Sequence, residues 1–564
     1  MNHRLIGDIL AETCGLSEEA LGEALKVQDE KGGRLGEILI RQKAISEADL
    51  TKGLSIQFDI PFSSTLPLEG LKTEFTEKVP IQFLKKYKMV PVITPNGASI
   101  ALSDPLLFQP LDDLCLLLGG DGMETVLVPP AAVLSVINFA YDMTRDSAEQ
   151  VIEGMHEEDT DLILSEIEDI GDLLDDTSDA PIIKLVNLML SQAVKDRASD
   201  IHVEPSQNRV KIRYRVDGIL YDKLSPPKHV QSTLVSRIKI MAKMNIAEKR
   251  LPQDGRIEIK IGDKNIDIRV STIPTAFGER VVMRLLDKTN VLLTVLDLGM
   301  PEDRLKEFDK LIRSAYGIIL VTGPTGSGKT TTLYAALSTI NTTDINIITI
   351  EDPIEYQIEG IGQIQINPKI DLTFANGLRS IVRQDPDVIL VGEVRDLETA
   401  EIAIQSALTG HLVFSTLHTN DSASAVTRLI DMGIEHFLVT SSVVAILAQR
   451  LVRVICNHCK EEYVPDEESL QNIGLNPKTV AGKKIYRGRG CPLCLNTGYR
   501  GRTGIFELMV LDDNLKRLIL KTSDANAIKH RAVEQGMVTL QQDGGQKVLD
   551  GITTIEEVFR ITYR

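Results

Sequence analysis

The chain has 564 residues and a formal net charge of −18, from 80 acidic and 62 basic side chains. Its length is several times a usual domain of about 100–200 residues, so we expect three or four compact units. The acidic balance argues against a general affinity for nucleic acid or for an anionic membrane surface. The longest apolar stretches, 317–322 and 388–392, are far shorter than the roughly 20 residues that span a bilayer, and acidic residues near the N-terminus exclude a secretory signal. We therefore expect a cytoplasmic protein.

The first 57 residues contain an internal repeat, in which residues 5–28 align with residues 34–57. Each copy has a short helix with apolar periodicity, then an N-cap signature at Ser17 or Ser46, then a second helix that ends in Gln. Two helical hairpins in tandem are predicted for 1–57. Mixed strand and helix patterns predict a small α/β domain over 58–145.

Most of the excess negative charge lies in residues 146–180, which contain fourteen Asp and Glu and no Lys or Arg. Apolar side chains are spaced among these acids, which favours a linker with one or two amphipathic helical turns. The linker is expected to separate mobile domains.

The pattern changes after the linker. An apolar helix at 182–193 is followed by strand patterns near 210–216 and 265–270, which predict an α+β domain over 181–290. Residues 291–450 alternate apolar strands with amphipathic helices, as in a parallel sheet with helices on both faces. A cysteine-rich element, 451–500, and a helical C-terminal domain, 501–564, complete the chain.

A phosphate-binding loop of the form G-x-x-x-x-G-K-[ST] begins at Gly323. It follows the apolar strand 317–322 and opens the helix 330–339, which is the context that gives this motif its meaning. The backbone N–H groups, the charge of Lys329 and the hydroxyl of Thr330 suit the β- and γ-phosphates and Mg²⁺. We predict a site for ATP and Mg²⁺ formed by Gly323, Pro324, Thr325, Gly326, Ser327, Gly328, Lys329, Thr330 and Thr331.

Candidate catalytic groups follow three other strands. Glu393 ends the apolar strand 388–393, and hydrolysis at a phosphate-binding loop needs such a carboxylate near Mg²⁺ and the attacking water. Glu351 and Asp352 follow the strand 347–350, where they either position the water or only cap a turn. His418 ends a further strand and is either a γ-phosphate sensor or a structural residue.

Two C-x-x-C pairs, Cys456 with Cys459 and Cys491 with Cys494, are separated by 31 residues. Two such knuckles are typical of a tetrahedral zinc site with four thiolates, which leaves no open position for catalysis. His458 is an alternative ligand, and a redox pair is an alternative use of the cysteines. We predict a structural Zn²⁺.

Arginines are frequent at strand positions between 197 and 284. Ordinary solvated strand faces would account for most of them. An oligomeric ATPase, however, commonly receives a cation from a neighbouring domain to offset charge in the transition state.

These residues together make the chain resemble the secretion ATPase superfamily, which includes type II secretion ATPases and type IV pilus assembly and retraction ATPases. The resemblance covers about 181–564. Within it, 281–288 and 389–396 look most like the secretion branch. The other matching segments, besides the phosphate-binding loop, are 198–205, 215–218, 252–256, 278–280 and 383–387.

The resemblance implies a RecA-like ATPase core, a PAS-like second N-terminal domain and a tetracysteine zinc element. It implies an Asp box at Glu351 and Asp352, a Walker B glutamate at Glu393, and a His box at His411 and His418. It also implies a homo-hexamer in which arginines of one subunit reach the nucleotide of the next, with Arg197, Arg213 and Arg215 as candidates. Inner-membrane platform proteins are the implied partners.

The first 57 residues resemble a second module, the cyclic di-GMP-binding N-domain of some pilus and secretion ATPases, which has two copies of R-L-G-x-x-L-L. The second copy begins with Arg34-Leu35-Gly36, whereas the first has Leu5-Ile6-Gly7, with Arg4 one place out of register. The resemblance implies the fold of this module and a possible site for cyclic di-GMP.

The leading functional hypothesis is an ATP-driven motor of type II secretion that pushes pseudopilus assembly from the cytoplasmic face of the inner membrane. A pilus-assembly ATPase would use the same chemistry with a different partner. A nucleic-acid motor has the same core, but this chain lacks a basic groove rich in aromatic residues. A non-hydrolysing scaffold would not require Lys329, Thr330 and Glu393.

Overall fold

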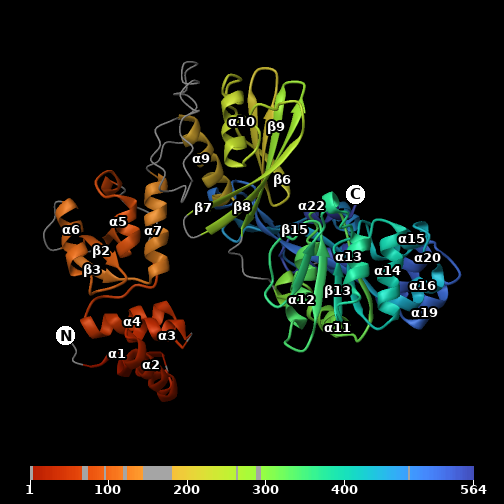
Figure 1. Ribbon diagram of the computed structural model, residues 1–564, viewed down its shortest axis with the longest axis horizontal. Coiled ribbons are helices and arrows are strands. Elements are labelled where there is room, and N and C mark those ends of the chain that lie inside the picture. Colours follow the sequence, from red (N-terminus) through yellow and green to blue (C-terminus); the bar gives the residue numbers. More distant parts are fainter. Residues whose placement is uncertain are drawn as a thin grey trace.

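The computed structural model describes residues 4–14, 16–42, 44–66, 74–94, 97–118, 123–143, 181–261, 264–287, 294–480 and 483–563. Figure 1 shows the two N-terminal units at one end of the molecule and the large sheet with its helices at the other. The predicted acidic linker, 146–180, lies outside the described residues. Within them, no helix is both long and apolar enough to cross a membrane.

The N-terminal repeat forms two helical hairpins. Ser17 and Ser46 cap the second helix of each copy, since the two side chains accept hydrogen bonds from the backbone N–H of Ala20 and Asp49. The first helix of each copy packs against the second helix of the other, so the copies form one core. The predicted N-caps are confirmed, and the helices are α1 (Ile6–Cys14), α2 (Glu18–Lys31), α3 (Leu35–Arg41) and α4 (Glu47–Phe58).

A small three-stranded unit follows. Its strands β1 (Met89–Thr94) and β2 (Gly97–Leu102) form an antiparallel pair, and β3 (Glu124–Leu127) lies parallel to β2. Apolar side chains of the sheet and of α7 form its core. The other elements are a 3₁₀ turn, η1 (Glu74–Glu77), and the helices α5 (Ile81–Tyr87), α6 (Phe108–Leu118) and α7 (Pro130–Met143).

The second N-terminal domain is an antiparallel sheet of six strands in the order β6-β5-β4-β9-β8-β7. Inward and outward side chains alternate along its strands, so the arginines of β5 stand between buried residues. The helices α9 (Pro181–Lys195) and α10 (Val230–Met241) cover its buried face. The strands are β4 (Ala198–Pro205), β5 (Val210–Val216), β6 (Ile219–Leu224), β7 (Gln253–Ile261), β8 (Lys264–Thr275) and β9 (Gly278–Asp287).

The ATPase domain contains a sheet of seven strands in the order β12-β11-β13-β14-β10-β15-β18. All neighbouring pairs are parallel except β15 with β18. The central strands are continuous apolar runs because both faces of a parallel sheet are covered. The strands are β10 (Gly317–Thr322), β11 (Ile347–Glu351), β12 (Gly362–Gln365), β13 (Val388–Val391), β14 (Leu412–Leu417), β15 (Val443–Ile455) and β18 (Tyr499–Val510).

Helices cover both faces of this sheet, as the sequence predicts. Ile318 and Leu320 of β10 pack with α13, α14 and α15, whereas Ile319 and Val321 pack with α11 and α12 on the other face. The α/β class with a P-loop core is therefore confirmed. The helices are α11 (Glu302–Ile312), α12 (Lys329–Ile340), α13 (Phe374–Ile381), α14 (Leu397–Leu408), α15 (Ser422–Asp431) and α16 (His436–Ser442), with 3₁₀ turns η3 (Val295–Leu298) and η4 (Pro368–Ile370).

The cysteine element lies between β15 and β18, which pair from Ala445↔Val510 to Ile455↔Tyr499. The sequence placed the ends of the cysteine element at residues 450 and 500. These positions fall inside β15 and β18, because the two strands stay paired up to the first cysteine pair. The C-terminal helices pack against the sheet and this element. The remaining elements are β16 (Lys460–Tyr463), α17 (Glu467–Asn472), α18 (Pro477–Val480), β17 (Ile485–Gly488), η5 (Pro492–Cys494), α19 (Asp513–Ile519), α20 (Ala525–Glu534), α21 (Leu540–Leu549) and α22 (Ile555–Thr562).

Candidate active site

The phosphate-binding loop joins β10 to α12 at the carboxyl edge of the sheet. Gly323, Gly326 and Gly328 have φ values of +151°, +79° and +89°, which side chains rarely adopt. A Cβ on Gly323 would also lie only 2.4 Å from the carbonyl oxygen of Gln449. The loop therefore depends on glycine. Thr330 is exposed in the first turn of α12, so its hydroxyl is accessible to a hard cation such as Mg²⁺.

Lys329 is buried and bonds to its own loop. Its Nζ donates to the carbonyl oxygens of Gly323 at 2.6 Å and Pro324 at 3.2 Å. Burial lowers its pKa to about 8; the charge of Glu393 opposes this shift and that of Arg450 adds to it. A phosphate at the loop would stabilise the charged form of Lys329, which is the form that binds anions.

Lys329, His418 and Glu393 meet at this edge. The Nζ of Lys329 lies 3.4 Å from Nδ1 of His418, and Nε2 of His418 lies 3.4 Å from Oε2 of Glu393. The other carboxylate oxygen of Glu393 lies 2.5 Å from Nη2 of Arg395. The three come together because β10, β13 and β14 are parallel and end at the same edge, where open α/β sheets bind ligands.

The segment that carries His418 is fixed to the strand before the loop. Thr419 donates its backbone N–H to Oγ1 of Thr322 at 2.9 Å, and the two hydroxyls lie 2.8 Å apart. His411 precedes β14, a strand of six residues, and therefore lies about 20 Å away at the opposite edge. Its Nδ1 lies 2.7 Å from the carbonyl oxygen of Ser406. Only His418 of the two histidines thus lies at the phosphate-binding loop.

Glu351 ends β11, which lies beside β13, the strand that precedes Glu393. Glu351 is 4% exposed. Tyr334 of α12 donates its hydroxyl hydrogen to Oε2 of Glu351. Oε1 accepts hydrogen bonds from Thr349 at 2.5 Å and from Gln363 at 3.2 Å. Burial and the neighbouring carboxylate raise the pKa of Tyr334 well above its usual range. The carboxylate is therefore held in one orientation by side chains from three elements.

Sequence patterns missed these supporting residues. Tyr334 lies in the apolar pattern of α12, and Gln363 lies in a short polar strand without a motif. Arg395 lies in the segment 389–396 that resembles the secretion branch, but the resemblance implies no role for this residue. Arg450 lies inside the long strand β15, and a charge among its apolar residues is the only signal in the sequence that marks it.

Two of the three arginines predicted to reach a neighbouring subunit have contacts within their own domain. Arg213 pairs with Glu204 at 2.7 Å, and Arg215 donates to the carbonyl oxygen of Gly218 at 3.0 Å. Arg197 is exposed and lines a cavity of about 190 Å³ between the second N-terminal domain and the cysteine element. Another arginine of this domain, Arg269, contacts the segment after Glu351 in the same chain, through the carbonyl oxygen of Ile354.

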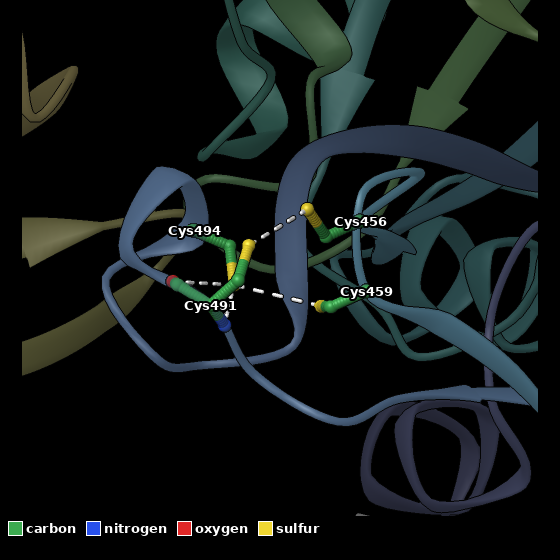
Figure 2. Close-up of side chains that lie close together, drawn as sticks. All are labelled: Cys456, Cys459, Cys491 and Cys494. Atoms are coloured by element: carbon green, nitrogen blue, oxygen red, sulfur yellow. Dashed lines mark hydrogen bonds between the residues drawn. The ribbon is translucent and has the colours of Figure 1, made fainter. Parts of the chain in front are cut away.

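The four cysteines converge, as Figure 2 shows. Their Sγ atoms all lie within 4.8 Å of one another. The separations are 3.9 Å for Cys456–Cys491, 3.8 Å for Cys459–Cys494 and 3.6 Å for Cys491–Cys494. A tetrahedron with Zn–S bonds of about 2.3 Å has edges of about 3.8 Å, which these three separations match, so the cluster is compatible with Zn²⁺.

Backbone N–H groups donate to two of these sulfurs. Gly490 donates to Sγ of Cys459 at 3.3 Å, while Cys491 and Gly498 donate to Sγ of Cys494 at 3.2 and 3.3 Å. Burial opposes ionisation of Cys494, but these N–H groups lower its pKa to about 7, whereas burial raises the pKa of Cys459 to about 12 in spite of the Gly490 donor. Thiolates are the form that binds metal. Among the described residues, the metal-ligating cluster found here consists of the four cysteines and does not include His458.

Comparisons with known proteins agree with this geometry. A family model described as Type II/IV secretion system protein matches residues 175–560, and an MshEN domain model matches residues 58–147. The chain is 44% identical over 557 residues to the type IV pilus assembly ATPase PilB of Myxococcus xanthus, covering 98% of each chain. It is 46% identical over 562 residues to type II secretion system protein E of Xanthomonas campestris, covering 99% of this chain and 98% of that one.

The solved structure of the ATPase DotB of Legionella pneumophila covers 67% of this chain and 95% of DotB, with a TM-score of 0.50 and 21% identity. This likeness shows a shared fold alone. The family model and the two relatives confirm the resemblance to secretion ATPases that the motifs indicate. The MshEN match begins where the helical repeat 1–57 ends, so the cyclic di-GMP module assigned to that repeat stays a prediction. The chain belongs to the type II/IV secretion system protein family and is an ATPase of that family.

Proposed function

We propose that the chain is the hexameric motor of type II secretion, which hydrolyses ATP at the cytoplasmic face of the inner membrane and drives pseudopilus assembly on membrane platform proteins. The observation that carries the proposal is the contact chain from Lys329 through His418 to Glu393 at the carboxyl edge of the sheet. ATP hydrolysis needs a cation at the phosphates and a carboxylate near Mg²⁺ and the attacking water, and these contacts bring Lys329 and Glu393 to one place.

Each residue has a distinct role in the proposed reaction. Lys329 leaves its carbonyl partners and binds the β- and γ-phosphates, where it offsets negative charge. Thr330 and Glu393 would hold Mg²⁺, which supplies further charge neutralisation when bound. His418 contacts both Lys329 and Glu393, so it can report whether the γ-phosphate is present. Glu351 positions the attacking water. Tyr334, Thr349 and Gln363 hold its carboxylate in one orientation, and a carboxylate held in this way can bind a water in a fixed place.

The choice of secretion over pilus assembly rests on two segments, 281–288 and 389–396, that look most like the secretion branch. The full-length relatives from the two systems are almost equally similar to this chain. Deletion of the gene in its source bacterium separates the two functions. We expect secreted enzymes to accumulate inside the cells while surface pili persist, with rescue by the wild-type gene and none by Lys329→Ala. Loss of pili with normal secretion would identify the chain as a pilus-assembly ATPase.

We also propose that neighbouring subunits complete each site with Arg197, Arg213 and Arg215. A cation supplied in trans can contribute about 10³–10⁵ in rate, so an isolated subunit should be nearly inactive. Mixing Lys329→Ala subunits with the triple arginine-to-alanine variant tests this, because some mixed interfaces pair an intact loop with intact arginines. Neither variant should work alone. Normal hydrolysis by the triple variant, or no recovery in rings shown to be mixed, would refute it.

The cysteine cluster supports a structural Zn²⁺ bound by Cys456, Cys459, Cys491 and Cys494, with the metal stabilising the element between β15 and β18.

Cyclic di-GMP remains a proposed ligand of the N-terminal repeat. In that repeat Arg34, the arginine of the intact motif, pairs with Asp104 of the next unit at 2.5 Å. A ligand that uses Arg34 therefore has to displace Asp104. Binding of cyclic di-GMP to the full chain, compared with Arg34→Ala, tests this point.

A further inference from the structure

Arg450 lies in β15, the strand beside the one that leads into the phosphate-binding loop. Its strand, β15, runs parallel to β10, and the last paired residues are Thr322 and Ala448. Residues 449–451 therefore continue beside the loop that follows Thr322. A Cβ on Gly328 would lie 2.8 Å from Nε2 of Gln449 and 3.5 Å from a methyl group of Leu451. Gln449 and Leu451 thus face the loop, whereas the side chain of Arg450, between them, points to the other side of the strand and reaches Asn420, two residues after His418.

The guanidinium of Arg450 is poorly paired for its burial. It is half-buried, and Nη2 donates to Oδ1 of Asn420 at 2.8 Å. Its Nε is buried without a hydrogen-bond partner, and in the described part of the chain Arg450 forms no ion pair. The carboxylate whose charge acts on it, Asp421, pairs instead with Lys529 at 2.9 Å. Arg453 and Arg304, two partly buried arginines of the same domain, also have an unpaired Nε, but each forms an ion pair, Arg453 with Glu557 at 2.5 Å and Arg304 with Asp543 at 2.9 Å.

Arg450 and Lys329 contact the same segment, through Asn420 and His418, and the charge of Arg450 lowers the pKa of Lys329, so the pair is unfavourable without a ligand. Two cations near one loop repel each other, and burial strengthens the repulsion because the local dielectric constant is low. A half-buried cation with an unsatisfied donor is costly unless an anion comes close. ATP brings such an anion to the same loop.

We propose that Arg450 is a phosphate-binding residue of the active site, contributed by the same subunit that supplies the phosphate-binding loop. Its guanidinium binds the polyphosphate of the nucleotide together with Lys329. The inference rests on the ATPase activity of this site and adds a residue to it. It is distinct from the arginines of the neighbouring subunit, since β15 belongs to the same sheet as β10.

Equilibrium binding of ADP and of a non-hydrolysable ATP analogue, with Mg²⁺, to the purified full chain tests the proposal. Arg450→Gln removes the charge, and Arg450→Lys keeps it. Arg313→Gln is the matched control, because Arg313 is an exposed arginine at the C-terminal end of α11 that pairs with Asp309. Asn420→Ala removes the observed partner of Arg450. Lys329→Ala is the reference for loss of the loop cation.

A hydrogen bond between charged groups typically corresponds to about tenfold or more in affinity, so Arg450→Gln should bind the analogue at least about tenfold more weakly. Arg450→Lys should recover part of this loss, and Arg313→Gln should bind as the wild type does. Asn420→Ala should lose less than Arg450→Gln. Without nucleotide, Arg450→Gln should unfold at a temperature no lower than the wild type, since an unpaired cation is removed.

Unchanged affinity in Arg450→Gln, beside a large loss in Lys329→Ala, would overturn the role of Arg450 and leave the site itself intact. An equal loss in Asn420→Ala, or a marked loss of stability in nucleotide-free Arg450→Gln, would also overturn it, because Arg450 would then act only as a structural residue. Normal binding by Lys329→Ala would instead contradict the assignment of the whole nucleotide site.

Discussion

Replacement of Tyr334 by Phe tests whether the orientation of Glu351 matters for hydrolysis. The change removes the hydroxyl that donates to Oε2 of Glu351 and leaves the ring in place. The ring packs edge-on against Tyr356, with centroids 4.6 Å apart, and Phe preserves that contact. Oε1 keeps Thr349 and Gln363, so one of the two carboxylate oxygens loses its donor.

A hydrogen bond to a charged acceptor contributes about 1.5–3 kcal/mol, and the acceptor here is buried. If the full amount is needed to hold Glu351 toward the water, turnover of Tyr334→Phe should fall about 10- to 150-fold. The KM for ATP should change little, because Tyr334 does not contact the phosphate-binding loop. Steady-state ATP hydrolysis by the assembled oligomer measures both quantities.

Tyr356→Phe is the matched control. It removes a hydroxyl from the neighbouring ring, and in the described structure that hydroxyl donates no hydrogen bond to Glu351. This variant should retain turnover close to that of the wild type. Equal turnover in Tyr334→Phe and Tyr356→Phe would refute the reasoning, since Glu351 would then need no fixed orientation.

Three further outcomes are expected. Glu393→Gln should bind ATP normally and lose about 10²–10³ in turnover, as measured by nucleotide binding and phosphate release; wild-type turnover would rule out Glu393. Metal analysis should find about one zinc per chain, lost when Cys491 and Cys494 are both changed to Ser; undiminished zinc would exclude the cysteine site. Affinity for nucleotide should decline as pH rises through about 8, because the charged Lys329 is lost above its pKa, whereas Lys329→Arg should show no such decline.

Much of the ATPase domain could be predicted because its strands are buried on both faces. Continuous apolar runs at 317–322 and 388–391 mark such strands, and the loop motif fixes which strand precedes the phosphate site. β18 was not expected, because it begins with Tyr499-Arg500-Gly501-Arg502, a polar glycine-containing sequence that is typical of a loop. Pairing with β15 outweighs that local preference.

The site was predictable only where a motif and a strand end coincide. Glu393 and His418 satisfy both conditions. His411 belongs to the same motif as His418, but a strand separates them and carries them to opposite edges. Tyr334, Gln363 and Arg450 act through contacts between segments far apart in the chain, and a single sequence has no local signal for such contacts.

The place where the cysteine element joins the sheet bears on how this family can vary. Because β15 and β18 are antiparallel neighbours, the chain leaves the sheet after Ile455 and returns to the same point at Tyr499. An excursion with adjacent ends can lengthen or shorten at small entropic cost, since the cost of closing a loop grows only slowly with its length. The element is thus open to insertion and deletion while the strands that carry the nucleotide site keep their order. A chain in which a short turn replaced residues 456–498 would keep the same sheet topology. Where the excursion is long, a bound metal is one means of holding it in a single shape.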